Sequence, residues 1–170
     1  EGYIDGVDAR VNDWPIIKDS LYHDQKLIDF LNMNTGDQKY IDEFKSYEGK
    51  SKLGKYEDNS ISRTMSVYLK GSVKSKSIYN YNGFVTQLII NYIKHKTGDD
   101  YEKLLNKIFA DKVKIKYSIL PTFSGGTGQG KLHPNLNASR YDWLRIAKAI
   151  MDDYQNDTCV GKYLKEIHKR

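Results

Sequence analysis

Apolar residues recur with a helical period along most of the chain. The clearest pattern lies between residues 84 and 98. Its apolar residues come in adjacent pairs that repeat every four positions, which places them on one face of a helix: Phe84, Val85, Leu88, Ile89, Tyr92 and Ile93. Gly98 then stands where a C-terminal cap is expected. The pattern predicts an amphipathic helix that ends at Gly98.

Further helices are expected at both ends of this segment. A short one follows Asp24 and ends before Gly36, and another covers residues 60–69. Polar residues suited to helix N-termini introduce three more, at Asp99, Ser139 and Thr158. The helix after Ser139 carries an apolar stripe: Leu144, Ala147, Ile150, Met151 and Tyr154.

One segment has the two-residue period of a strand. Val113, Ile115, Tyr117 and Ile119 alternate with polar residues, which predicts a half-buried strand over 113–119 that ends at Pro121. Residues 37–58, with a helical turn at most over 40–47, and residues 121–137 are expected to be loops. The fold class is therefore mainly α with one or two short strands, in a single domain over residues 1–170.

Composition excludes several classes of protein. The 170 residues are 39% hydrophobic, which is enough for a core and argues against disorder. Cys159 is the only cysteine, so no disulfide framework exists within the chain. No apolar run is long enough to span a membrane. The chain opens on Glu1 without a Met, so we expect a piece of something longer, and its cellular location stays undetermined.

The chain is basic, with 27 Lys and Arg against 22 Asp and Glu, a net charge of +5. Only five of the basic residues are Arg, the side chain that dominates bidentate base readout. Lys and Tyr interleave in several stretches, as in grooves that bind single-stranded nucleic acid. No recognised module accompanies them, and an AT-rich coding bias produces the same composition, so a nucleic-acid partner is disfavoured.

Two other site types find weak support. Residues 125–131 (GGTGQGK) nearly match a phosphate-binding P-loop, but Leu132 stands where the motif needs Ser or Thr, and Pro134 opposes an immediate helix. The four histidines are scattered, with no helical i, i+4 pair and no Cys cluster. We therefore expect neither a bound nucleotide nor a metal site.

Three segments in order resemble one enzyme family. Residues 1–8 (EGYIDGVD) and 27–36 (LIDFLNMNTG) are similar to "EGLIDLDDPV" and "LLxMxSG"; residues 79–98 are similar to "FxYsNxxxxLLG…tG"; and residues 139–147 (SRYDWLRIA) are similar to "saRDwaRfg". These motifs belong to the serine β-lactamase and penicillin-binding-protein-like hydrolases, in the branch with class C β-lactamases, esterases and 6-aminohexanoate-oligomer hydrolases. The resemblance covers nearly the whole chain.

The resemblance implies a mechanism and a site. In that family a Ser of a Ser-x-x-Lys motif attacks an amide or ester carbonyl, and a Tyr exchanges the Ser proton. Tyr81 matches this catalytic Tyr, with Tyr79 as the runner-up. Gly83 matches a substrate-binding position that is usually Asn or Ser. A phenol with a pKa of about 10 is a poor base at neutral pH unless nearby cations favour its phenolate form. No cofactor is implied.

The chain departs from the family in its nucleophile. No Ser has a Lys three residues later, and Ser60 comes closest with Arg63. Residues 96–98 (KTG) spell the family's third motif, but the periodicity places them at a helix end. The chain thus resembles the helical subdomain of the β-lactamase-like α+β fold, with most of the sheet absent. We expect it to be inactive alone, with the remainder of its own polypeptide as partner.

The missing sheet and the missing nucleophile have consequences for the stability of the chain and for its function. Helical stripes that lack their sheet would expose apolar surface, so we expect the isolated chain to self-associate or to be marginally stable. The alternative functions are a non-catalytic β-lactamase-like binding module and, less favoured, a basic nucleic-acid-binding helical domain. The choice among β-lactam, short amide and ester substrates lies beyond the sequence, because it depends on loops.

Overall fold

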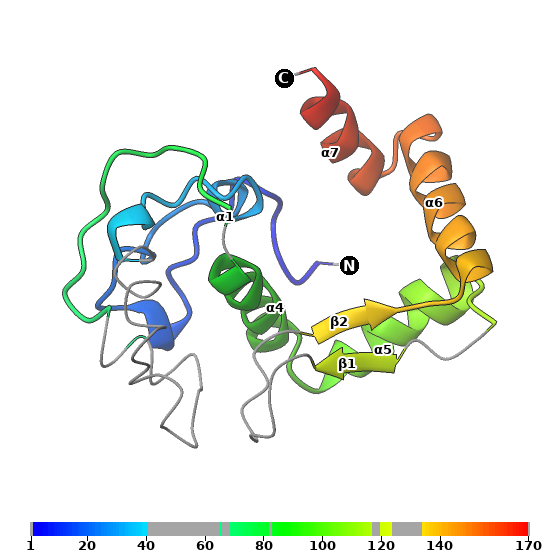
Figure 1. The fold of residues 1–170 in the computed structure, drawn as a ribbon, viewed down its shortest axis with the longest axis horizontal. Coiled ribbons are helices and arrows are strands. Elements are labelled where there is room, and N and C mark those ends of the chain that lie inside the picture. Colours follow the sequence, from blue (N-terminus) through cyan, green and yellow to red (C-terminus); the bar gives the residue numbers. More distant parts are fainter. Residues whose placement is uncertain are drawn as a thin grey trace. The chain divides into compact units, whose positions relative to one another are not determined.

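The computed structural model describes residues 2–40, 65, 69–81, 83–116, 120–123 and 134–169, without the side chains of 120–123 and 134–137 (Figure 1). Helices dominate it, as predicted. The helices are α1 (Leu27–Leu31), α4 (Gly83–Thr97), α5 (Tyr101–Asn106), α6 (Arg140–Gln155) and α7 (Cys159–His168). Short 3-10 turns cover Pro15–Ile17 and Gly98–Asp100, and a π-helix covers Lys107–Lys112. Strands β1 (Leu120–Phe123) and β2 (Pro134–Asn137) pair with each other.

The structure consists of two compact units. The first contains Glu1–Gly98 and Phe123–Pro134, and the second contains Asp99–Thr122 and Asn135–Arg170. The boundary falls at Gly98, whose φ of +52° ends α4 in a left-handed conformation that glycine adopts without strain. The predicted cap is thereby confirmed, and each unit is described by itself below.

The first unit has the larger buried core. Helix α4 packs on α1 and on the irregular N-terminal segment, and Val85 and Leu88 are fully buried. The ring of Trp14 lies 6.0 Å from that of Tyr92 on α4. The core comprises Val11, Trp14, Ile17, Leu21, Tyr22, Leu27, Phe30, Met65, Leu69, Val85, Leu88 and Tyr92. The helical period of residues 84–93 correctly predicted α4 and its buried face.

The second unit is organised by polar side chains. Ser139 caps α6 by accepting a hydrogen bond from the Asp142 backbone N–H, and Thr158 caps α7 by accepting one from the Gly161 N–H. Both caps were predicted. Asp153 near the end of α6 is 5% exposed and accepts two hydrogen bonds from Lys112 Nζ, at 2.7 and 2.6 Å. The end of the π-helix is thus tied to α6 within this unit.

The strand predicted over 113–119 is wrong in its described part. The Val113 and Ile115 backbone N–H groups donate to the carbonyls of Ile108 and Phe109, so they close the preceding helix instead of pairing with a strand. Lys114, with a φ of +61°, adopts the left-handed conformation that ends many helices. The described strands lie later, at Leu120–Phe123 and Pro134–Asn137, both partly or wholly within the expected loop 121–137.

One helix start also needs correction. Asp99 does not cap α5, because Gly98–Asp100 forms a 3-10 turn that runs into the helix, and Asp100 stands at the N-cap. The Asp100 carboxylate makes no capping bond and accepts a 2.8 Å hydrogen bond from Lys103 Nζ. The apolar stripe of α6 is largely exposed in the described structure, with Leu144 66% and Met151 58% exposed. The buried residues of α6 are instead Asp142 and Asp153.

Several predicted features lie outside the described residues. Most of the helix expected over 60–69 is among them, although Met65 is described as helical and buried. The glycine-rich segment 125–131, most of the loop 37–58 and the strand positions Tyr117 and Ile119 also lie outside. Within the described ranges, no helix combines the length and the hydropathy that crossing a bilayer requires.

Candidate functional site

The loop that carries the predicted catalytic tyrosine leads directly into α4. Tyr81 is 69% exposed and Tyr79 is 71% exposed, so both phenols are accessible to solvent. Between them, the Asn80 backbone N–H donates a 2.9 Å hydrogen bond to the Met33 carbonyl oxygen. This bond anchors the loop to the segment that follows α1. Gly83 is the first residue of α4 and is partly buried.

The segment that receives this loop has an unusual backbone. Met33 has a φ of +50° and Gly36 a φ of +69°, both in the left-handed region. The Gly36 carbonyl accepts hydrogen bonds from the Ser75 backbone N–H at 3.0 Å and from Ser75 Oγ at 2.8 Å. A Cβ on Gly36 would lie 2.6 Å from the Ser75 carbonyl oxygen, so only glycine fits there. Strained backbone of this kind is common at functional sites.

Buried polar groups lie around the same segment. Tyr22 is fully buried and donates a 2.8 Å hydrogen bond to Asp37 Oδ2, and Asp37 is 1% exposed. Burial, followed by the charge of Asp37, raises the pKa of Tyr22 well above its ordinary value. Tyr22 is therefore a hydrogen-bond donor to Asp37 and stays protonated. The sequence analysis did not single out either residue, because no local motif connects a Tyr and an Asp fifteen positions apart.

A second polar cluster, also not predicted, surrounds Asp13 in the first unit. Asp13 accepts a 2.6 Å hydrogen bond from Lys96 Nζ and a 3.1 Å hydrogen bond from the Tyr92 hydroxyl. Burial alone would raise the pKa of Asp13, but these two bonds outweigh it and lower the pKa. Burial, with the charge of Asp13, raises the pKa of Tyr92 to about 12. The Tyr92 hydroxyl therefore stays protonated and donates to Asp13, which holds the N-terminal segment against α4.

Residues 96–98 make their contacts at the C-terminal end of α4. Lys96 holds Asp13, and the Thr97 hydroxyl donates to the Ile93 carbonyl within α4. The helix then ends at Gly98. All three residues therefore complete the C-terminal end of α4, as the periodicity predicted.

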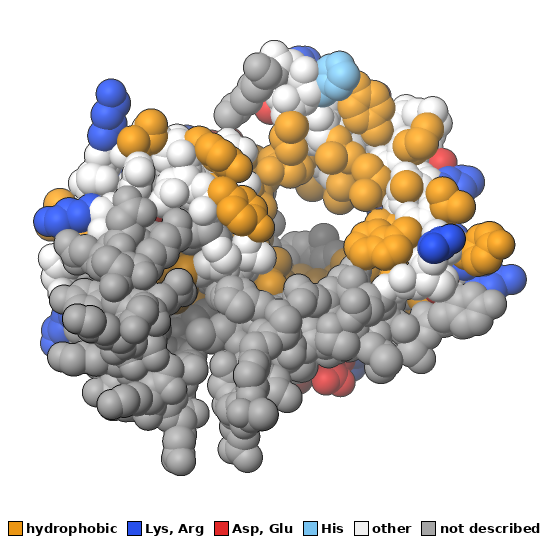
Figure 2. Space-filling view, viewed as in Figure 1, with side chains coloured by type: hydrophobic (Ala, Val, Ile, Leu, Met, Phe, Trp, Pro, Cys, Tyr) orange, Lys and Arg blue, Asp and Glu red, His pale blue; other side chains and the backbone are white. Residues whose placement is uncertain are grey.

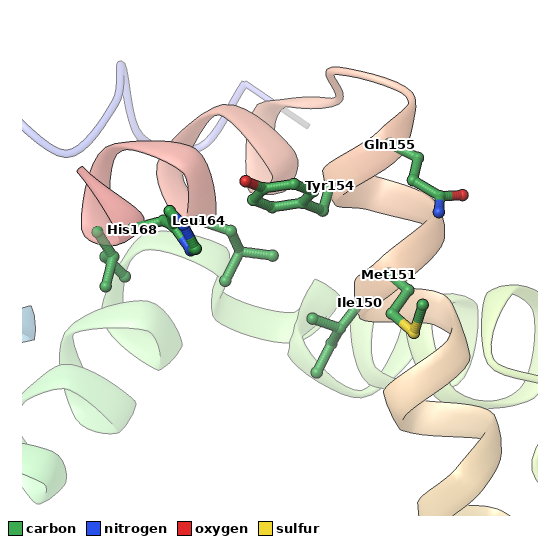
Figure 3. Close-up of a pocket in the computed structure, with 7 residues that line it drawn as sticks. Ile150, Met151, Tyr154, Gln155, Leu164 and His168 are labelled. Carbon is green, nitrogen blue, oxygen red and sulfur yellow. The ribbon is translucent and has the colours of Figure 1, made fainter.

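The second unit offers a different kind of surface. A groove of about 340 Å³ lies between α6 and α7. Its lining is mostly apolar, with Ile150, Met151, Tyr154 and Gln155 from α6 and Leu164, Ile167 and His168 from α7 (Figure 3). The Tyr154 and His168 rings meet edge to face at 6.2 Å. Hydrophobic side chains also gather over both helices in the space-filling view (Figure 2). The apolar stripe of α6 forms one side of this exposed groove.

Metal-binding side chains do not assemble in the described part of the chain. It contains no group of three or more His, Cys, Asp or Glu residues with the geometry to hold an ion. Cys159 is free and exposed at the start of α7.

Comparison with known proteins adds no assignment. No protein-family model, no curated protein and no solved structure matches this chain.

Proposed function

We propose that this chain is the helical part of a serine hydrolase with the β-lactamase-like fold, which cleaves amide or ester bonds through an acyl-enzyme on a Ser. Tyr81 is the general base and acid in this proposal, and Gly83 lies at the substrate-binding position. One observation carries it: the hydrogen bond from the Asn80 N–H to the Met33 carbonyl joins residues 79–98 and 27–36, two of the three segments that resemble the family.

The surroundings of Tyr81 suit a proton-transferring phenol. Its side chain is 69% exposed, so a substrate can reach it, while the backbone next to it is held by the Asn80 bond. Tyr81 precedes α4 by two residues. It is thus accessible and lies next to an anchored stretch of backbone, which supports the role proposed for it.

The nucleophile must come from residues beyond this sequence, because none of its Ser residues is followed by a Lys at the third position. The chain alone is therefore expected to give no covalent product with a fluorophosphonate probe, since removal of the nucleophile abolishes acyl transfer. Covalent labelling of this chain would contradict the proposal. The genomic coding sequence is the companion measurement, and we expect a Ser-x-x-Lys motif in the same reading frame.

The decisive variant is Tyr81→Phe in the polypeptide that carries the Ser-x-x-Lys motif. Loss of a general base and acid lowers kcat by about 10²–10⁴-fold, measured on nitrophenyl esters and on nitrocefin. Tyr79→Phe is the matched control, because Tyr79 is equally exposed, lies in the same loop and differs only in the proposed role. Equal effects of the two substitutions would overturn the role of Tyr81. A coding sequence without the motif would overturn the hydrolase itself and leave the non-catalytic binding module.

A further inference from the structure

A pocket of about 290 Å³ in the first unit is lined by the N-terminal segment and by the last turns of α4. This volume lies near the lower end of the range for small-molecule sites, so the pocket suits a small ligand. The site of the proposed hydrolase uses none of its residues. The polar part of the lining comes from both sides: Asp5, Arg10, Asn12 and Asp13 from the segment, and Tyr92 and Lys96 from α4.

Hydrogen bonds hold the two sides of this pocket together. The Leu27 backbone N–H donates a 2.9 Å hydrogen bond to the Ala9 carbonyl, which fixes the N-terminal segment on α1. Asp13 accepts hydrogen bonds from Tyr92 and Lys96, which join the segment to α4. The described residues therefore form the pocket within the chain itself, and the inference does not rest on the proposed hydrolase.

Four charged side chains line the pocket, and three of them already have a partner. Asp13 and Lys96 pair with each other at 2.6 Å. Arg10 pairs at 3.3 Å with Asp24, which lies outside the lining. Asp5 is exposed and has no hydrogen bond or ion pair within the described ranges of the chain. One negative charge of the lining is therefore left for a ligand.

The charge of Asp5 acts on the same pocket as the paired Asp13. Burial raises the pKa of Tyr92 most, followed by the charge and the hydrogen bond of Asp13 and then by the charge of Asp5. A carboxylate acts on a phenol in this way at short range, since water and salt screen distant charges. Asp5 thus lies near a tyrosine that lines the pocket. The Asn12 amide, another group of the lining, also has no hydrogen bond in the part of the chain that the structure describes.

We propose that this pocket binds a small organic cation, a primary amine with a short apolar body, through an ion pair between its ammonium group and Asp5. An ammonium group has three donors, and the Asn12 amide oxygen is a second acceptor in the same pocket. The pocket already contains one pair of this chemistry, because the Lys96 ammonium binds the Asp13 carboxylate.

The charge balance and the walls of the pocket define this class of ligand. With the partner of Arg10 included, three carboxylates stand against two cations, so the local charge favours a positive ligand and disfavours an anion. Ile4 and Ala9 supply the apolar part of the lining, against which a short alkyl chain can pack.

The test uses the full chain and butylammonium chloride. Sodium butyrate is the probe of similar size and opposite charge, and butanol is the neutral one. Amide chemical shifts are followed by NMR at neutral pH and constant ionic strength up to about 100 mM probe, because exposed ion pairs are weak. We expect saturable shifts with butylammonium at residues 4–13 and at Tyr92 and Lys96, with a Kd of about 1–10 mM and at least about tenfold weaker binding of the other two probes.

Two variants make the result specific to the pocket. Asp5→Asn removes the charge with little change in shape and should weaken butylammonium binding about tenfold or more. Asp8→Asn is the matched control, because Asp8 is exposed in the same segment, pairs with Lys26 and does not line the pocket. Its affinity should equal that of the unmodified chain. Absence of saturable shifts with butylammonium, equal affinity for butyrate, or equal effects of the two substitutions would overturn the proposal.

Discussion

Substitution of Gly161 by Ala tests the packing of α6 against α7 most directly. Gly161 lies in the first turn of α7 and is buried against the last turns of α6. A Cβ at this position would overlap the Asp153 carbonyl oxygen, and would lie 2.6 Å from the carbonyl carbon and 3.1 Å from the Tyr154 nitrogen. All three atoms belong to the backbone, so no side-chain rotation relieves the overlap.

Two opposing effects decide the sign of this change. Ala is a better helix former than Gly by about 1 kcal/mol, which by itself would stabilise α7. Overpacking of a close contact costs about 1–3 kcal/mol and more where the backbone must move. The clash therefore wins, and we expect a net destabilisation of about 2 kcal/mol or more. For a chain of this size, that lowers Tm by about 4–8 °C.

Thermal and urea unfolding measure this loss. Cys159→Ala is the control, because Cys159 lies in the same turn of α7 and is exposed, so its substitution should change the stability little. A Gly161→Ala chain that is as stable as the unmodified protein, or more stable, would refute the reasoning. It would mean that the backbones of α6 and α7 do not approach each other at Gly161.

Two further predictions concern the two units separately. The Tyr92 phenol, with a pKa of about 12, should ionise in an ultraviolet titration well above the ordinary tyrosine value of 10.0. Because the pKa of Tyr92 is raised in the folded state, the neutral phenol contributes its full stabilisation below about pH 10, and this contribution is lost between about pH 10 and 12. Tyr92→Phe should flatten this part of the plot of stability against pH. An unchanged plot would contradict the prediction. The exposed apolar surface of α6 and α7 should make the isolated chain self-associate in sedimentation experiments. Met151→Lys, at a position 58% exposed, should weaken the association, and a monodisperse, highly stable monomer would argue against it.

Local patterns were sufficient to predict much of the helical framework. The period of residues 84–93 gave α4, and Ser139 and Thr158 indicated where α6 and α7 begin, because a cap depends on residues only three apart. The strand prediction over 113–119 failed because the alternation of Val113 and Ile115 is also compatible with a helix end. The left-handed Lys114 and the bonds back to Ile108 and Phe109 decide between the two, and neither is visible in a hydropathy pattern.

The polar clusters were harder to predict because their members are far apart in sequence. Asp13 meets Tyr92 and Lys96 across about eighty positions, and Tyr22 meets Asp37 across α1 and the turn that follows it. Only the packing of α4 and α1 in the first unit brings these pairs together. Tyr81 and Gly83 were located through resemblance instead, and their proposed roles stay predictions for the kinetic experiments.

The π-helix at Lys107–Lys112 makes the second unit respond differently to length changes at different points of one helix. A π-turn accommodates an extra residue within an otherwise α-helical path, so deletion of one residue there would restore regular α-helix with little change in the direction of the following side chains. Deletion of one residue in the regular turns of α5 would instead rotate those side chains by about 100° around the axis. Lys112 would then leave Asp153, and the buried carboxylate would lose the cation that it binds. A length change of one residue should therefore be tolerated better within the π-helix than within α5.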